Sequence, residues 1–152
     1  MTTEQMERRG ESLNKLHTLL DTRKETLSLY SQLAAMRPFQ VDQDIQMTLQ
    51  EFCEALVDYT ASAHFQLYQY IEDGSERREG VKKAASKVYP SISSLTKLIL
   101  DFNEKYDCGD NEDMSNTFEH LDEDLSKLGE ILADRILLED QVISVFSGSR
   151  VI

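Results

Sequence analysis

The chain has 152 residues, the length of one compact domain, and can bury a core without disulfides or metals. It carries 28 acidic and 16 basic residues, a formal net charge of −12, so its surface repels nucleic acid phosphates and anionic lipid headgroups. Direct binding to DNA, RNA or a membrane is therefore not expected. With no signal peptide pattern and no apolar run long enough to span a bilayer, we expect a cytoplasmic protein.

The first predicted helix spans residues 10–36, because apolar side chains there recur every three or four positions. Leu16, Leu20 and Leu27 belong to this apolar seam. The same count also places Arg23 in the seam, at a position where a leucine is expected.

The second and third predicted helices span residues 42–72 and 77–107, separated by an Asp-Gly turn signal. The second has a regular seam from Ile45 to Ala63, followed by a crowded group of aromatic residues. The third keeps its apolar spacing throughout, and Pro90 is its one predicted kink.

The fourth predicted helix spans residues 112–147, and its seam places Arg135 and Glu139 among leucines. Strand-type alternation is missing, and long helices joined by short loops pack as antiparallel neighbours. We therefore predict an all-α, antiparallel four-helix bundle that forms a single domain over residues 1–152.

Charged residues in an apolar seam indicate a polar cluster between the helices. A buried charge costs several kcal/mol, as an order of magnitude, unless it is paired and hydrogen-bonded. Arg135 and Glu139 stand four residues apart and can meet on one helix face, with Arg23 opposite. Asp58 and His64 are further candidates for this cluster. The alternative is that the two arginines reach solvent at the edge of the bundle.

The negative charge is concentrated in the last third of the chain. Residues 1–100 carry 14 acids and 12 bases, whereas residues 101–152 carry 14 acids and 4 bases. The acids between Asp101 and Asp124 can attract a basic partner, or they can simply form a solvated face. For a smaller basic group from Arg77 to Lys87, a solvated helix face is the favoured interpretation.

Catalytic and metal-binding patterns are missing from the sequence. The two cysteines, Cys53 and Cys108, form no CxxC or ligand array, which indicates reduced thiols and no metal or cofactor. None of the three histidines follows a glutamate at the Glu-x-x-His spacing of di-metal bundles. His64 lacks the lysine and glycine that follow the histidine of phosphotransfer bundles. We therefore expect a protein that is not an enzyme.

The second helix contains the stretch LQEFCEALVDYTASAHFQLY at residues 49–68. It resembles the pattern FCxxLVDYxSAGHFxxY of the Rsd/AlgQ family of bacterial anti-sigma factors. Arg23-Lys24, Leu128-Gly129-Glu130 with Arg135, and Leu138-Glu139-Asp140 also resemble the family, so the similarity spans most of the chain in order. Two departures are Ala63 in place of a glycine, and His17-Thr18-Leu19 in place of Asp-Arg-Trp.

This resemblance implies an all-helical protein that binds the housekeeping, sigma-seventy-type sigma factor of RNA polymerase. Binding is expected through the C-terminal promoter-reading domain of the sigma factor, and sequestration would regulate transcription. Asp58 matches the sigma-contacting aspartate of the family. Tyr59, His64, Phe65 and Tyr68 share its motif and either bind the sigma factor or have a structural role.

Two further hypotheses remain open. Some family members are linked to a sugar-phosphotransfer carrier protein, which is therefore a second candidate partner. A ligand-sensing or phosphotransfer-type signalling bundle is the alternative function, and it rests on His64, the polar cluster and the basic group around Lys82.

Overall fold

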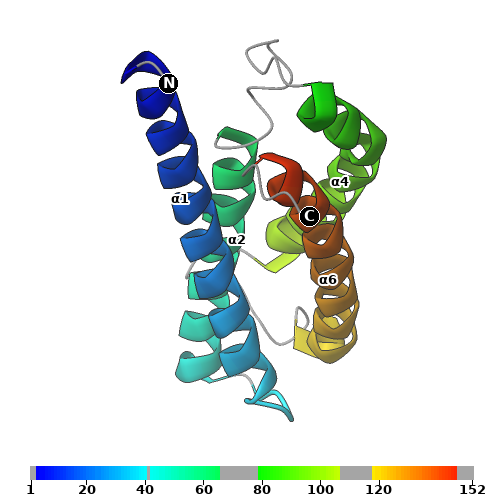
Figure 1. Cartoon of the computed structure of the whole chain (residues 1–152). Coiled ribbons are helices and arrows are strands. Elements are labelled where there is room, and N and C mark those ends of the chain that lie inside the picture. Colours follow the sequence, from blue (N-terminus) through cyan, green and yellow to red (C-terminus); the bar gives the residue numbers. More distant parts are fainter. Residues whose placement is uncertain (1–2, 41, 66–78, 107–117, 147–152) are drawn as a thin grey trace.

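The computed structural model describes residues 3–40, 42–65, 79–106 and 118–146. Four long helices run alternately in opposite directions (Figure 1) and, within these ranges, no strand occurs. The prediction of an all-α antiparallel bundle is therefore confirmed. The elements are α1 (Thr3–Ala34), α2 (Gln43–Ala63), α4 (Glu79–Tyr106), the short 3-10 helix η2 (Phe118–His120) and α6 (Leu121–Phe146).

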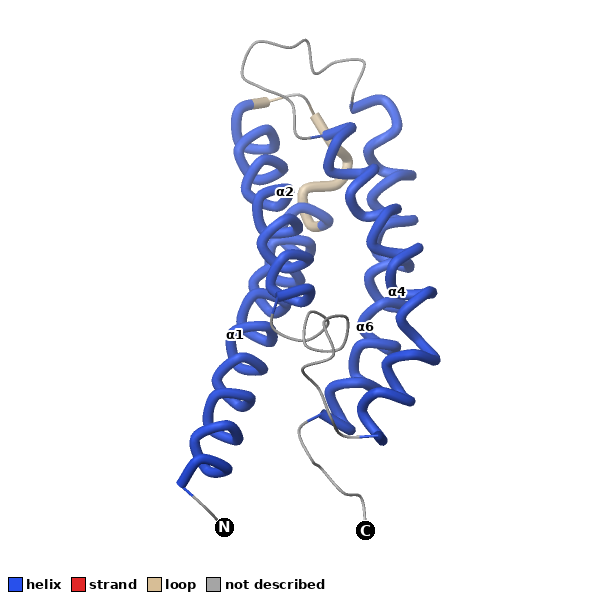
Figure 2. Tube along the Cα trace, turned by 90° about the horizontal axis from the view of Figure 1, so that it is seen from above, coloured by secondary structure: helices blue, strands red, loops and turns tan. Residues whose placement is uncertain are grey.

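The helices form two closely packed pairs, α1 with α2 and α4 with α6 (Figure 2). The pairs join mainly through α2 and α4, and α1 touches α6 least among these neighbours. None of the described helices is both long and apolar enough to cross a membrane.

The helix boundaries differ from the predicted ones in three places. α1 begins at Thr3 rather than residue 10, because good helix formers flank Gly10 and offset its penalty of about 1 kcal/mol. α2 ends at Ala63, with a π-turn at residues 64–65, and the predicted continuation to residue 72 lies outside the described residues. The predicted start of the fourth helix at residue 112 also lies outside them, and α6 itself begins at Leu121.

The apolar seam of α1 is rotated relative to the predicted one. Leu19, Thr26 and Leu33, spaced seven residues apart, are fully buried, whereas Leu27 is 38% exposed. Thr26 is accepted at a core position because its hydroxyl donates to the carbonyl oxygens of Thr22 (2.9 Å) and Ala55 (3.2 Å), so no polar atom is left unsatisfied. A search for apolar residues alone misses such a position.

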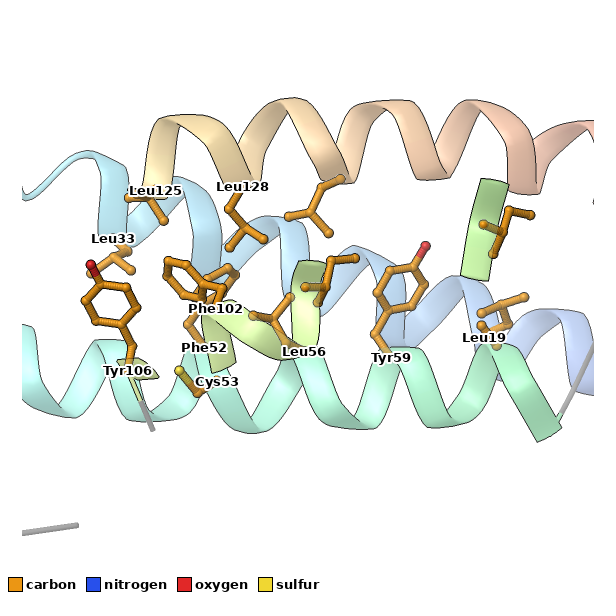
Figure 3. Packing of buried hydrophobic residues seen from close by; sticks show 14 of the residues in the cluster. Leu19, Leu33, Phe52, Cys53, Leu56, Tyr59, Phe102, Tyr106, Leu125 and Leu128 are labelled. Carbon is orange, nitrogen blue, oxygen red and sulfur yellow. The ribbon is translucent and has the colours of Figure 1, made fainter. Parts of the chain in front are cut away.

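The core between the two helix pairs contains a row of aromatic rings (Figure 3). Phe52 packs edge-on against Tyr30 and Phe102, with ring centroids 5.9 and 6.0 Å apart, and Phe102 contacts Tyr106 at 4.6 Å. Buried leucines such as Leu56 surround this row, and each contributes about 1.5–3 kcal/mol of hydrophobic stabilisation.

A glycine allows α1 and α6 to approach each other. Tyr30 lies across α6 and its hydroxyl donates to the carbonyl oxygen of Leu125 at 2.9 Å. A Cβ at Gly129 would lie 2.9 Å from the Cζ atom of Tyr30 and even closer to its hydroxyl oxygen. Residue 129 must therefore lack a side chain for Tyr30 to occupy this position.

Asp124 links α6 to the end of α4. Its carboxylate accepts hydrogen bonds from Lys105 (Nζ to Oδ2, 2.6 Å) and from the hydroxyl of Tyr106. Burial tends to raise the pKa of Asp124, but the hydrogen bonds from Lys105 and Tyr106 outweigh it and lower that pKa on balance. Burial and the neighbouring Asp124 raise the pKa of Tyr106, whose hydroxyl stays protonated.

The first prediction concerns Gly129→Ala. The clash with Tyr30 is expected to cost about 1–3 kcal/mol, which the roughly 1 kcal/mol that alanine gains over glycine in a helix offsets only in part, so the free energy of unfolding should fall by up to about 2 kcal/mol. Urea unfolding measures the change. In a Tyr30→Leu background the clashing atoms are gone, so the same substitution should no longer destabilise. An equal loss in both backgrounds would contradict the role given to Tyr30.

The second prediction concerns pH. Because the pKa of Asp124 is lowered by folding, its stabilising contribution is present above its unfolded pKa of about 3.9 and is lost as the pH falls through the folded value. Asp124→Asn should therefore be less stable than the parent chain at pH 6, and the gap should narrow towards pH 3. Urea titrations at both pH values test this, and a gap independent of pH would exclude the ionised form of Asp124 as its cause.

Candidate functional site

Glu139 of α6 is completely buried, and its carboxylate is shared by three other helical residues. Oε1 accepts a hydrogen bond from the hydroxyl of Tyr59 on α2 at 2.7 Å, and Oε2 accepts one from Nη1 of Arg135 at 2.8 Å. Nη1 of Arg23 on α1 lies 3.4 Å from Oε1. The structure thus brings Arg23, Arg135 and Glu139 together between the helices.

Arg135 extends this arrangement to α4. Its Nε donates to the hydroxyl of Thr96 at 3.0 Å, and its guanidinium carbon lies 4.9 Å from the centre of the Tyr59 ring, a cation–π contact. We call Arg23, Tyr59, Thr96, Arg135 and Glu139 the buried polar cluster. It has one member or more on each of the four long helices.

The protonation states of the cluster follow from its surroundings. Burial and the negative charge of Glu139 raise the pKa of Tyr59, so its hydroxyl remains a donor. Burial tends to lower the pKa of Arg23, but the adjacent carboxylates of Asp140, 2.7 Å away, and Glu139 raise it on balance. The carboxylate of Glu139 is therefore surrounded by two guanidinium groups and one neutral phenol.

The outer face of α2 carries the second group of candidate residues. Asp58 is exposed and lines a groove of about 550 Å³ between α1 and α2. Among the charged residues of this groove, Lys24 is basic and the other five are acidic. The acids are Asp21 and Glu25 of α1, and Glu51, Glu54 and Asp58 of α2.

Two exposed apolar side chains lie along the same side of the chain as the acidic residues Glu51, Glu54 and Asp58. Met47 is 54% exposed and Phe65 is 57% exposed. Met47, Glu51, Glu54 and Asp58 follow one another on α2 at intervals of three or four residues, the spacing that aligns side chains along one side of a helix, and Phe65 lies just beyond the end of α2, seven residues after Asp58. We call these five residues the α2 stripe.

The candidates from the sequence motif therefore separate into two places. Asp58 and Phe65 are on the surface, and Asp58 does not belong to the interior cluster for which it was a candidate. Tyr59 is fully buried, because it projects from the opposite side of α2 towards Glu139. His64 is partly buried, with its ring edge-on to Phe65 at 5.2 Å, and Tyr68 lies outside the described residues.

Metal-ligating and thiol side chains can be located within the described part of the chain. No group of three or more His, Cys, Asp or Glu side chains there is placed to hold a metal ion. Cys53 is a buried free thiol. Much of the acidic run between residues 101 and 124 lies outside the described residues, as do Arg77 and Arg78 of the basic group.

Several members of these groups are not among the sequence candidates. Thr96 is uncharged, so a search for charged residues in the apolar seams does not find it. Its role depends on the position of the Arg135 side chain, whose Nε donates to the Thr96 hydroxyl. Glu51 and Glu54 could be found from their spacing to Asp58, seven and four residues before it. Asp21 and Glu25 join the groove because α1 packs beside α2, which is a tertiary relationship.

The third prediction tests the buried polar cluster. Glu139→Leu should lower the free energy of unfolding by about 3–5 kcal/mol, because it removes the buried carboxylate that pairs with Arg135 at 2.8 Å. Adding Arg135→Met should restore part of this loss, because the buried guanidinium that Glu139 neutralises is then removed as well, whereas Tyr59 and Arg23 still lack their contact with Glu139. Urea unfolding of the two single variants and the double variant gives the coupling. Losses that simply add would show that the two side chains do not act as a pair.

Comparison with known proteins shows the family of this chain. The family model described as "Regulator of RNA polymerase sigma(70) subunit, Rsd/AlgQ" matches residues 1–147. A protein named "Regulator of sigma D" from Yersinia enterocolitica is 34% identical over 140 residues, covering 90% of this chain and 83% of the relative. Another of that name from Enterobacter sp. is 33% identical over 147 residues, covering 91% and 84%.

No solved structure matches the chain. The family match covers nearly its whole length and includes both the buried polar cluster and the α2 stripe. This chain therefore belongs to the Rsd/AlgQ family of regulators of the RNA polymerase sigma(70) subunit.

Proposed function

We propose that this chain is an anti-sigma factor that binds the housekeeping sigma factor through its C-terminal promoter-reading domain and sequesters it from RNA polymerase. The function is that of a binding protein and not of an enzyme. The observation that carries the proposal is the exposed Asp58 within the acidic groove of α1 and α2.

Charge supports a basic partner at this groove. A domain that reads promoter DNA presents basic side chains to phosphates, and five carboxylates with one lysine can compete for the same cations. Asp58 is suited to accept two hydrogen bonds from one arginine, because its carboxylate is exposed on the outer face of α2. Complementary charge also accelerates encounter, an effect that salt screens.

Exposed apolar side chains next to the carboxylates can serve as buried anchors of an interface. Protein interfaces combine a polar rim with buried apolar anchors, and aromatic and methionine side chains are enriched among them. Phe65 and Met47 occupy the two ends of the α2 stripe, about 27 Å apart at the helical rise of 1.5 Å per residue. A patch of this length is compatible with a standard interface of roughly 800 Å² per partner.

Tyr59 and Glu139 contribute indirectly in this proposal. Tyr59 follows Asp58 in the chain and is held by Glu139, which fixes the rotation of α2 about its axis. The acidic side of α2 is thereby turned outward, beside Asp21 and Glu25 of α1. A sugar-phosphotransfer carrier protein remains a second predicted partner, on the ground of the family resemblance alone.

The fourth prediction is that Asp58→Ala weakens binding to purified housekeeping sigma factor by about tenfold or more, the loss of one charged interface contact. Calorimetry at low salt measures the Kd, and circular dichroism checks the fold. Asp101→Ala on α4, also an exposed acid, is the matched control and should bind like the parent chain.

The parent complex should also weaken as sodium chloride rises, because the charges are exposed to screening. Equal Kd values for Asp58→Ala and the parent chain would remove Asp58 from the interface. Absence of any complex between the parent chain and the sigma factor on a sizing column would refute the proposed function as a whole.

A further inference from the structure

A second groove runs along the opposite side of α1, between α1 and α6, the neighbouring helices that touch least. Its volume is about 410 Å³, and it is lined mainly by apolar side chains. Leu27 and Tyr30 of α1 face Ala133, Ile136 and Leu137 of α6 across it.

An ion pair lies at one end of this groove, where Asp140 contacts Arg23 at 2.7 Å. Tyr30 lies at the other end, beside Gly129. Beyond the lining residues, the hydrogen bond from Tyr30 to the backbone of Leu125 and the contact of Arg37 with Asp122 at 2.6 Å also join these two parts of the chain. The two helices are thus held at a defined spacing, and the groove is part of the folded structure.

Large apolar side chains are exposed to solvent along the borders of the groove. Leu137 is 64% exposed, the highest value among the large apolar side chains in the described part of the chain, and Leu27 opposite is 38% exposed. Contiguous exposed apolar surface with a polar border is typical of a protein interaction site.

We propose that the α1–α6 groove is a docking surface for a basic amphipathic helix of a partner protein, separate from the surface that carries Asp58. The lining residues of α6 run from Gly129 to Asp140, which corresponds to about 16 Å along the helix and accommodates a helix of roughly 11 residues. An apolar face inserted between two helices is a common mode of peptide recognition.

Charge indicates the chemistry of the docked helix. Asp140 lines the groove, and Glu130 and Asp134 are exposed seven and three residues before Leu137, on the same side of α6. Lysine or arginine side chains flanking an apolar stripe would meet these carboxylates. A second copy of this chain is disfavoured as the occupant, because each copy carries a net charge of −12.

The position of the groove separates it from the proposed sigma-binding surface. Leu27 in this groove and Glu25 in the acidic groove are about 160° apart around α1, at 3.6 residues per turn. A partner seated on the α2 stripe therefore leaves the α1–α6 groove accessible. The two surfaces can be occupied at the same time.

The test uses a fluorescein-labelled peptide of about 11 residues, with leucines at alternating three- and four-residue intervals and lysines between them. Fluorescence anisotropy with the full chain should give saturable binding. Leu137→Glu should weaken it by about tenfold or more, whereas Leu100→Glu, an equally drastic change at an exposed leucine of α4, should not. Both variants should keep the parent affinity for the sigma factor, and Asp58→Ala should keep the parent affinity for the peptide.

Four results would overturn the proposal. They are equal binding of the peptide to Leu137→Glu and the parent chain, equal binding of a peptide with the same residues in scrambled order, displacement of the peptide by the sigma factor, and dimerisation of the parent chain that Leu137→Glu abolishes. The scrambled peptide identifies attraction by charge alone. Displacement would assign the groove to the sigma interface, and dimerisation would assign it to a second copy. Loss of sigma binding by Asp58→Ala is a separate result, so each proposal can fail without the other.

Discussion

The carboxylate of Glu139 is the interaction on which the rest of the structure depends. It is fully buried and is satisfied from α1 by Arg23, from α2 by Tyr59 and from its own helix by Arg135, which also reaches Thr96 on α4. Buried ion pairs add little net stability compared with apolar packing, but an incomplete one is strongly destabilising. Such a cluster therefore disfavours packings of the four helices in which any one of them is shifted or rotated.

The orientation of α2 follows from this constraint. Tyr59 points inward to Glu139 and the neighbouring Asp58 points outward, so the buried hydrogen bond acts together with the apolar side of α2 in turning the acidic side towards solvent. The exposed side then combines carboxylates with two apolar side chains, Met47 and Phe65. Because leucine seams alone permit small rotations and shifts of a helix, the polar contact supplies specificity that apolar packing lacks.

Helix α1 separates two surfaces of different character. The groove it shares with α2 is acidic, and the groove it shares with α6 is apolar, with the Arg23–Asp140 ion pair at one end. Arg23 belongs to both the interior and the surface, because it contacts the buried Glu139 and the exposed Asp140. Membership of a family of sigma(70) regulators gives the first surface its proposed partner, whereas the second is proposed from its shape and charge.

The sequence by itself determined the helical class, the antiparallel bundle and the three ionisable residues of its seams, because helical periodicity and the cost of burying charge are local or additive properties. Its motif also singled out Asp58 and Phe65. Only the tertiary structure decided that Tyr59 is internal, that Thr26 replaces Leu27 in the seam, and that Asp21 and Glu25 join Asp58. These outcomes depend on how each helix is rotated about its axis against its neighbours. The apolar pattern of a single helix defines that rotation only to within about one residue position.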